Sequence, residues 1–306
     1  MLTPPTSLDD GAIARAVRAH WLPDLHEIKY LPWGFGAHHW QAIGAGTTLF
    51  VTLDQLEPRH TAASLEAAYA GAAALAAGSA AVCAPLPADT GRYTVAVGSE
   101  ALSVTPWLDG HSPTEAEAAE PAHAREVIRV LNGLHRATPP AGIRRWTPQI
   151  GPDFADELAA RTATTWTSGP LAEPARRALR ARTAAVATWT RRYLELANSA
   201  LTHRGSWVPT HGEPHHRNQV ITGDGLKLVD WESLALAPPE RDYADLGEAV
   251  ESLRPDPAMV ELFALDWRLA EIAEYARWFA AAHTGTDDDH TALQGLFEEL
   301  DVNAGR

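Results

Sequence analysis

The segment THGEPHHRNQVITGDGLKLVDWE, residues 210–232, carries the densest cluster of polar side chains in the sequence. Within it, two short apolar runs, Val220-Ile221 and Leu226 to Val229, flank a glycine-containing turn at residues 223–225. Apolar runs joined by such a tight turn predict a β-hairpin. A hairpin brings the residues that precede its first strand next to those that follow its second strand.

Three oxygen-bearing side chains lie at the open end of this predicted hairpin. Glu213 and Asn218 precede the first strand, and Asp230 follows the second. Carboxylate and amide oxygens, completed by water, are the ligands that hard divalent cations such as Mg²⁺ prefer. The segment therefore predicts a magnesium site at this end of the hairpin.

A zinc site is the alternative for the same loop, because zinc binds histidines together with a carboxylate. The candidate ligands are His211, Glu213, His215 and His216. Their spacing matches no helical zinc motif, and Pro214 disfavours a helix here. We therefore expect His211 to support the loop through a hydrogen bond, and His215 and His216 to be either exposed loop residues or ligands.

On either side of this segment, the periodicity of apolar residues divides the chain near residue 106. The earlier part predicts strands at residues 27–31, 39–43, 48–53, 93–97 and 101–105, with helices at 8–20 and 61–78. The later part predicts helices at residues 113–137, 153–166, 173–199 and 258–282. Ser112 is expected as a helix N-cap, Pro121 as a break or restart, and Asp287 to Asp289 as an exposed turn. The pattern is typical of an α+β protein.

The composition excludes several classes of protein. Lys and Arg number 25 against 39 Asp and Glu, and the resulting net charge of −14 disfavours nucleic acid and anionic lipid as partners. This acidity either favours a cationic ligand or only keeps the chain soluble. Cys83 is the single cysteine, so an intrachain disulfide is excluded, and neither a signal peptide nor a membrane-spanning run is visible. We expect a cytoplasmic protein.

The order of these motifs resembles that of the aminoglycoside phosphotransferase family and related small-molecule kinases. In that family, a His-Gly-Asp loop is followed by Asn and then by a hydrophobic strand that ends in Asp. The matching positions here are His211-Gly212-Glu213, Asn218 and Val229-Asp230-Trp231. The resemblance spans residues 25–250, and the region around Gly34 and Gly36 is most similar to spectinomycin-type phosphotransferases.

The resemblance implies a bilobal, protein-kinase-like fold of the α+β class. Residues 1–105 would form the N-lobe with the nucleotide-binding sheet, and residues 106–306 the helical C-lobe with the catalytic loop and substrate pocket. The implied reaction moves the γ-phosphoryl group of ATP or GTP, with Mg²⁺, to a hydroxyl of a small polar molecule, such as a cationic, aminoglycoside-like compound. Neither nucleic acid nor a membrane is implied as a partner, and the chain is expected to be a monomer or a dimer.

The resemblance also assigns roles around the catalytic loop. Glu213 orients the acceptor hydroxyl and takes its proton, with His211 beside it in the catalytic loop. Asn218 and Asp230 hold the magnesium ion. Asp242, in the segment that follows the hairpin, braces the loop.

Further residues are assigned to the ligands. The nucleotide contacts are expected at Gly34, Gly36, Thr52, Glu66, Thr105 and Trp107. Trp33 and Trp40, near the glycine loop, are expected either to contact a ligand or to pack in the core. Glu271 and Glu274 are expected either to attract ammonium groups of the substrate or to form a solvated helix face.

Two departures from the family affect this assignment. Glu213 replaces the catalytic aspartate and is one methylene longer. Thr52 stands where the third strand should carry a phosphate-binding lysine, whose glutamate partner would be Glu66, and the chain has only two lysines, Lys29 and Lys227.

Three interpretations of the missing lysine stay open. A relocated cation, such as Lys29, His38, His39 or Arg59, replaces it; the donor binds in another pose; or the chain is a pseudokinase that binds without transferring phosphate. A kinase fold used for another transfer, such as that of a nucleotidyl group, is a further alternative.

Overall fold

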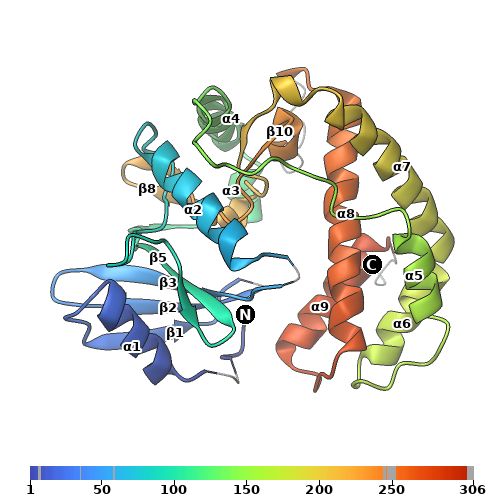
Figure 1. Ribbon diagram of the computed structural model, residues 1–306, viewed down its shortest axis with the longest axis horizontal. Helices are drawn as coiled ribbons and strands as arrows, with labels where there is room; N and C mark the ends of the chain where they lie inside the picture. The colour runs from blue at the N-terminus through green and yellow to red at the C-terminus, as the bar shows by residue number, and fades with distance from the viewer. Residues whose placement is uncertain (6–7, 35, 58, 244–245, 247–252, 302–306) are drawn as a thin grey trace. The chain divides into compact units, whose positions relative to one another are not determined.

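Five strands form an antiparallel sheet in the order β1-β2-β3-β5-β4 (Figure 1). Their bounds are Glu27–Leu31 for β1, Ala37–Ile43 for β2, Thr48–Asp54 for β3, Val95–Val97 for β4 and Glu100–Pro106 for β5. The five predicted strands are confirmed, each within a few residues of its expected bounds. This sheet carries Thr52 and Thr105, two of the positions expected to contact the nucleotide.

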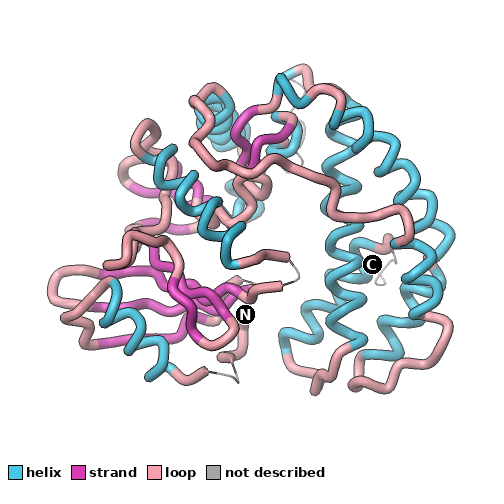
Figure 2. The backbone as a smooth tube through the Cα atoms, in the orientation of Figure 1, coloured by secondary structure: helices cyan, strands magenta, loops and turns pink. Residues whose placement is uncertain are grey.

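The chain divides into two compact units, which are Met1–Trp146 with Ser206–Arg254, and Thr147–Gly205 with Pro255–Arg306. The computed structural model describes residues 1–5, 8–34, 36–57, 59–243, 246 and 253–301. All the described strands belong to the first unit, whereas the second is built from helices (Figure 2). The expected lobe boundary near residue 106 lies at the end of β5, inside the first unit, and stays a prediction.

One face of the sheet packs against helix α1, Asp10–His20. Alternation along the strands places Trp40 and Val51 on this face, where both are fully buried together with Ile13 and Val17 of the helix. The indole of Trp40 donates a hydrogen bond of 2.7 Å to Asp10 Oδ1. Trp40 is therefore a core residue, the second of its two expected environments.

A second hydrophobic cluster joins helix α2, Ala62–Ala76, to helix α4, Pro121–His135. The alanine-rich α2 begins at a capping box, in which Thr61 and Ser64 bond each other's backbone N–H. The cluster includes Leu226 and Leu228 of the predicted hairpin, which is confirmed as β8, Gln219–Thr222, and β9, Gly225–Leu228. Strand β8 also pairs with a short β6, Gly110–His111. Strand β7, Val208–Thr210, precedes the hairpin and strand β10, Ala235–Ala237, follows it, and these two strands pair with each other.

The helices show where sequence periodicity misplaced boundaries. The remaining elements are α3 Glu115–Ala118, α5 Phe154–Arg161, α6 Ala172–Ala181, α7 Thr183–Leu201, α8 Pro257–Ala280 and α9 Asp287–Glu299, with short 3-10 helices at Arg204–Ser206, His216–Asn218 and Pro239–Asp242. The expected restart at Pro121 is confirmed. The expected N-cap at Ser112 is wrong, because Thr114 caps α3 through a capping box with Glu117. The single helix expected at 173–199 is also wrong, because α6 ends and α7 begins at Arg182.

The expected exposed turn at Asp287 to Asp289 is wrong as well. These residues form the first turn of α9, and Asp288 and Asp289 are only 1% and 4% exposed. Asp289 accepts hydrogen bonds from the N–H groups of Gly285 and Thr286 and from the indole of Trp278, so it completes the capping box whose N-cap is Thr286. Across the part of the chain that the structure describes, no helix combines the length and apolar character needed to cross a membrane.

Candidate active site

The catalytic loop follows β7 and begins with a glycine that no other residue can replace without strain. Gly212 has φ +100°, and a Cβ placed on it would lie 2.4 Å from the guanidinium nitrogens of Arg241. That guanidinium donates to Thr210 Oγ1 at 3.1 Å and to the carbonyl of Ser233 at 2.9 Å. Arg241 therefore packs against Gly212 and fixes the catalytic loop through these hydrogen bonds. The sequence did not indicate this role.

His211 is fully buried and hydrogen-bonded at both ring nitrogens. Nε2 donates to the Val229 carbonyl at 2.8 Å, while Nδ1 accepts from the Glu213 N–H at 3.3 Å. Burial lowers the pKa of His211, although Asp242 nearby opposes the shift, so the ring is neutral with its proton on Nε2. The expected supporting hydrogen bond is present, whereas a direct part in catalysis stays a prediction.

Asp242, the residue expected to brace the loop, is fully buried and accepts three hydrogen bonds. The donors are the N–H of His211 at 3.1 Å, the N–H of Gly212 at 2.7 Å and Nε2 of His135 at 2.8 Å. Burial alone would raise the pKa of Asp242, but the bonds from His135 and the loop outweigh it and hold the pKa below its ordinary value. The carboxylate thus ties α4 to the catalytic loop.

Replacing Asp242 with Ala is expected to lower the free energy of unfolding by about 3–5 kcal/mol, because two buried N–H groups and a histidine lose their acceptor. Since the folded-state pKa is lowered, the stability that Asp242 supplies is present above its unfolded pKa of about 3.9 and is lost as the pH falls through the folded value. Thermal unfolding at pH 7 and pH 3 measures both effects. Asp24→Ala, which removes an exposed carboxylate bonded to the N–H of Ala45, is the control and should cost less than about 1 kcal/mol. An equal loss in both variants would contradict the bracing role.

Glu213 is held in place by a residue outside the predicted set. Ser233, which is buried and lies three residues after Asp230, donates through its hydroxyl to Glu213 Oε1 at 2.8 Å. The bond leaves Oε2 as the second carboxylate oxygen and fixes the rotamer of the long side chain. The longer side chain of Glu213 is accommodated because its carboxylate reaches the hydroxyl of Ser233 and accepts a hydrogen bond from it.

Asn218 and Asp230 are brought together by the hairpin. The N–H of Val229 donates to the carbonyl of Asn218 at 3.0 Å, so Asp230 comes directly after the residue paired with Asn218. The Asn218 side-chain Nδ2 donates to the Glu213 carbonyl at 3.0 Å, which leaves its Oδ1 as an acceptor. Asp230 adopts φ +64°, a left-handed conformation that is uncommon outside glycine and is often found at functional sites.

The charge around Asp230 is strongly negative. The surrounding protein displaces water, and the carboxylates of Glu232, Glu213 and Asp54 lie close, so the pKa of Asp230 is raised well above its ordinary value. Its side chain nevertheless remains exposed, so a ligand can reach it. An accessible carboxylate whose ionisation is opposed by its neighbours gains from a bound cation. The donor set of carboxylate and amide oxygens fits Mg²⁺, while among the described residues no three His, Cys, Asp or Glu side chains gather as a metal site.

The glycine loop and the hinge meet at an aromatic cluster. Gly34 and Gly36 have φ values of +71° and +97°, whereas Phe35 lies outside the described residues. Trp33, 51% exposed, stacks on Phe50 at 6.4 Å between ring centroids and lies 6.1 Å from Trp107. We call Trp33, Phe50 and Trp107 the aromatic cluster. Phe50 pairs with Thr105 of the hinge strand. Phe50 was not among the predicted site residues, and its alternation with the buried residues of β3 is the one signal that could have placed it on this face of the sheet.

The position of the missing lysine is filled by neutral groups. Thr52 pairs with His39 across β2 and β3, and Thr52 Oγ1 lies 3.3 Å from His39 Nδ1. Burial, the positive chain N-terminus and then His38 lower the pKa of His39 to about 3, so this ring is uncharged near neutral pH. His39 is therefore not a substitute cation.

Glu66, the expected partner of the lysine, serves another purpose. Its carboxylate accepts from the N–H groups of Tyr93 and Thr94 and from the Thr94 hydroxyl, at 2.9, 3.0 and 2.7 Å. The connection between β3 and α2 is made instead by the Tyr69 hydroxyl, which donates to Asp54 Oδ2 at 3.0 Å, both side chains being buried. Thr52 and Glu66 thus bond to other groups, and their part in nucleotide binding stays a prediction.

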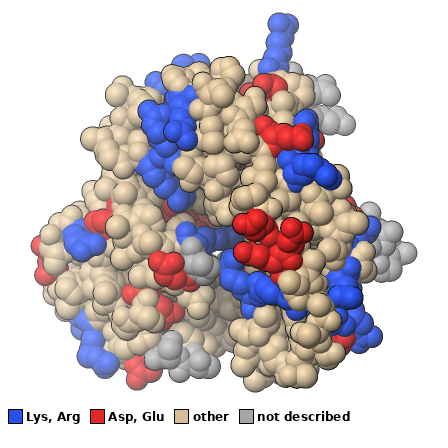
Figure 3. All heavy atoms as spheres, turned by 45° about the vertical axis from the view of Figure 1, so that its right-hand side comes forward, with Lys and Arg blue, Asp and Glu red and all other residues tan. Residues whose placement is uncertain are grey.

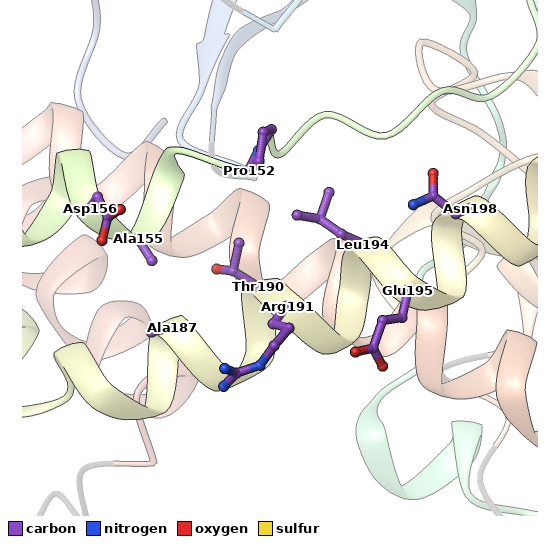
Figure 4. Close-up of a pocket in the computed structure, with 9 residues that line it drawn as sticks. All are labelled: Pro152, Ala155, Asp156, Ala187, Thr190, Arg191, Leu194, Glu195 and Asn198. Atoms are coloured by element: carbon purple, nitrogen blue, oxygen red, sulfur yellow. The ribbon is translucent and has the colours of Figure 1, made fainter.

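The second unit holds a separate hollow of about 410 Å³ between α5 and α7 (Figure 4). Asp156, Arg191 and Glu195 bring both signs of charge to its wall. Glu271 and Glu274, the weakly expected substrate contacts, are not among its lining residues. On α8, Glu271 is buried and Glu274 forms an ion pair with Arg277, so a role in substrate binding stays a prediction for both.

Comparison with known proteins places this geometry in a family. A spectinomycin phosphotransferase, solved in complex with ADP and spectinomycin, superposes with a TM-score of 0.72 at 12% identity, covering 96% of this chain and 97% of that chain. A microcompartment-associated aminopropanol kinase gives 0.64 at 14% identity over 95% of each chain. The fold is therefore kinase-like, and its likeness to spectinomycin-type enzymes is confirmed.

Sequence comparison agrees. Protein StrN of Streptomyces griseus is 40% identical over 92 residues, which cover 30% of this chain and 28% of StrN's own length. The model of the phosphotransferase enzyme family matches residues 27–287. Since this match includes the sheet, the catalytic loop and the hairpin, the chain belongs to the phosphotransferase enzyme family.

Proposed function

We propose that this chain transfers the γ-phosphoryl group of ATP or GTP to a hydroxyl of a small polar molecule, with Mg²⁺ bound beside the catalytic loop. The observation that carries the proposal is the loop itself. The Glu213 carboxylate, oriented by Ser233, faces the same end of the hairpin as Asn218 and Asp230. A base next to a magnesium-type donor set is what phosphoryl transfer to a hydroxyl requires.

In the proposed reaction, the acceptor oxygen attacks the γ-phosphorus while the bond from phosphorus to the bridging oxygen of the β-phosphate breaks. The hydroxyl proton passes to Oε2 of Glu213, and the nucleoside diphosphate leaves with the bridging oxygen. His211, neutral and fully bonded, keeps the backbone of Glu213 in place. Proton removal by a positioned carboxylate contributes about 10²–10⁴-fold to such reactions.

Asn218 Oδ1 and the Asp230 carboxylate would hold the magnesium ion, which neutralises phosphate charge when bound. Burial and three neighbouring carboxylates raise the pKa of Asp230, so a divalent cation would bind there in competition with a proton. We assign Asn218 as the second protein ligand because its Nδ2 donates to the Glu213 carbonyl, which orients the amide and leaves Oδ1 for the metal ion.

The nucleobase is proposed to lie against the aromatic cluster. Trp33 and Trp107 flank Phe50, which pairs with Thr105 in the strand that leads into the hinge. Stacking on an aromatic face tolerates any purine, which agrees with either ATP or GTP as donor. The Trp107 N–H donates to the Thr48 carbonyl at 3.2 Å and so keeps the hinge beside β3.

The acceptor is proposed to be a polar alcohol that carries an amine. The solved relatives include a spectinomycin phosphotransferase and an aminopropanol kinase, and the chain itself has a net charge of −14. On the face in Figure 3, however, acidic and basic side chains lie interspersed. Local contacts rather than a broad acidic field would then recognise the amine. Because the donor is an intracellular nucleotide, we place the reaction in the cytoplasm.

One observation favours a second candidate, a nucleotide-binding pseudoenzyme. Thr52 and neutral His39 occupy the position of the phosphate-binding lysine. A panel of aminoglycosides, aminocyclitols and amino alcohols, incubated with ATP or GTP and Mg²⁺ and analysed by mass spectrometry, separates the two. We expect one class to gain a phosphoryl group as nucleoside diphosphate forms, and Glu213→Gln to abolish the product. Tight nucleotide binding without any product would support the pseudoenzyme.

A further inference from the structure

The donor's phosphates need positive charge, and neither Thr52 on β3 nor the uncharged His39 on β2 supplies it. Carboxylates gather at the open end of the hairpin, because Ser233 Oγ bonds Glu213 Oε1 at 2.8 Å and Asp230 and Glu232 lie between β9 and Ser233. A polyphosphate entering this field without a protein cation would be repelled, even with one magnesium ion bound. Resting on the proposed function, the question is therefore which residue replaces the lysine.

Three other cations of this unit donate hydrogen bonds to backbone carbonyls or to the loop. The Arg144 guanidinium donates to the carbonyls of Leu234 and Glu232, and Arg241 donates to the loop. Lys227 Nζ donates to the Ala80 carbonyl at 2.8 Å. Lys29 pairs with Gln41 on β1, at the far side of β2 from β3, which places its backbone about 10 Å from that of Phe50.

The turn between β3 and α2 brings Arg59 and His60 toward these carboxylates, since His60 Nε2 lies 3.4 Å from Glu232 Oε2. The Glu57 N–H donates to the His60 carbonyl at 2.7 Å, and the capping box at Thr61 fixes the chain on the other side. Arg59 and His60 are thereby held between two defined elements. Burial, the largest effect, raises the pKa of Asp230 and of Glu232, although His60 and the neighbouring arginines bring the pKa of Glu232 below its ordinary value. Arg59 lowers both pKa values through its charge. It is exposed and carries its charge at every physiological pH.

His60 stands out among the buried side chains. It is only 4% exposed, yet neither of its ring nitrogens has a hydrogen-bond partner among the described residues. Nε2 lies 3.4 Å from Glu232 Oε2, within ion-pair distance but without hydrogen-bond alignment. Buried polar groups in this state are rare and call for a functional explanation. We infer that the Glu232 carboxylate holds the ring of His60, and with it the turn that carries the neighbouring Arg59.

We propose that Arg59 supplies the positive charge that binds the β- and γ-phosphates of the donor, and that His60, held against Glu232, positions the turn that carries it. Arg59 takes over the electrostatic part of the absent lysine, and its planar guanidinium suits phosphate oxygens. The Tyr69–Asp54 bond takes over the other part, the attachment of α2 to β3.

The test compares the affinities for ATP and AMP, both with Mg²⁺, by calorimetry. Arg59→Gln is expected to weaken ATP binding about tenfold to a hundredfold and to leave AMP binding unchanged, because only ATP carries the contacted phosphates. Arg59→Lys should restore part of the ATP affinity. His60→Leu should show the same ATP-selective loss, and His60→Gln, whose amide can reach Glu232, should restore it. Arg15→Gln, on α1 at the opposite face of the sheet, is the matched control.

Equal losses for ATP and AMP in Arg59→Gln, or no loss at all, would overturn the inference. So would an ATP-selective loss in Lys29→Ala with none in Arg59→Gln, which would leave the proposed function intact. A wild-type chain that binds neither nucleotide would overturn the proposed function and, with it, this inference.

Discussion

Asp230→Asn is expected to abolish magnesium-dependent nucleotide binding and to lower kcat/KM by at least about 10²–10³-fold, because a neutral amide replaces the charged metal ligand. Asparagine suits the test better than alanine, since it is isosteric and tolerates the φ of +64° at this position. The substitution also removes a charge that Glu232, Glu213 and Asp54 oppose. Thermal stability should therefore stay unchanged or rise while function is lost.

Asp224→Asn is the matched control, because it makes the same chemical change in the exposed turn of the same hairpin. Nucleotide titration with and without Mg²⁺, together with the melting temperature, distinguishes the variants. Magnesium-dependent affinity that survives in Asp230→Asn would remove this residue from the metal site. A fall in stability equal to the loss of binding would point to a structural role instead.

Glu213→Gln is expected to leave nucleotide affinity intact and to lower kcat by about 10²–10⁴-fold, because the amide cannot take the acceptor proton. Glu213→Asp tests the length of the side chain. Ser233 now holds Oε1 at 2.8 Å, and the shorter residue would retreat from it by about 1 Å, a displacement that can cost about 10²-fold. The family's own aspartate should therefore be a poor substitute here.

Steady-state kinetics with saturating nucleotide measure both Glu213 variants, and calorimetry verifies that nucleotide binding is unchanged. Glu115→Gln, at an exposed position on α3, controls for the loss of one negative charge. Turnover in Glu213→Gln at the wild-type rate would exclude Glu213 as the base. Full activity in Glu213→Asp would show that the contact with Ser233 does not set the position of the carboxylate.

The sequence was sufficient for the parts of the site that depend on local pattern. The hairpin that aligns Asn218 with Asp230 follows from two apolar runs and a glycine turn, and the sheet follows from alternating strands. The contact between Asp242 and the catalytic loop was expected from the resemblance alone. Each of these features depends on residues near one another in sequence or on an ordered motif.

The parts that could not be predicted depend on contacts between distant segments. Nothing local shows that Ser233 bonds Glu213, that Tyr69 reaches Asp54 or that His60 meets Glu232. The same holds for Asp289. The run of three acidic residues to which it belongs suggests an exposed turn, but its carboxylate accepts from the N–H groups of Gly285 and Thr286 at the start of α9. Polar side chains are assigned to the surface by composition, and only the fold reveals which of them are buried with partners.

Thr52 stands where the family's pattern places a lysine, so a cation for the phosphates would have to come from another element. The β3 position is neutral and lies beside His39, and we propose Arg59, on the turn that follows the strand, as the cation instead. Phosphoryl transfer depends on positioning and charge neutralisation rather than on one covalent group, so the cation can come from a different element that reaches the same phosphates.

Calorimetric titration of the wild-type chain with ATP and with GTP, in the presence and absence of Mg²⁺, tests the central claim most directly. We predict binding at one site per chain that requires Mg²⁺ and that Asp230→Asn abolishes. Failure of both nucleotides to bind, with or without the metal ion, would contradict a nucleotide-dependent phosphotransferase.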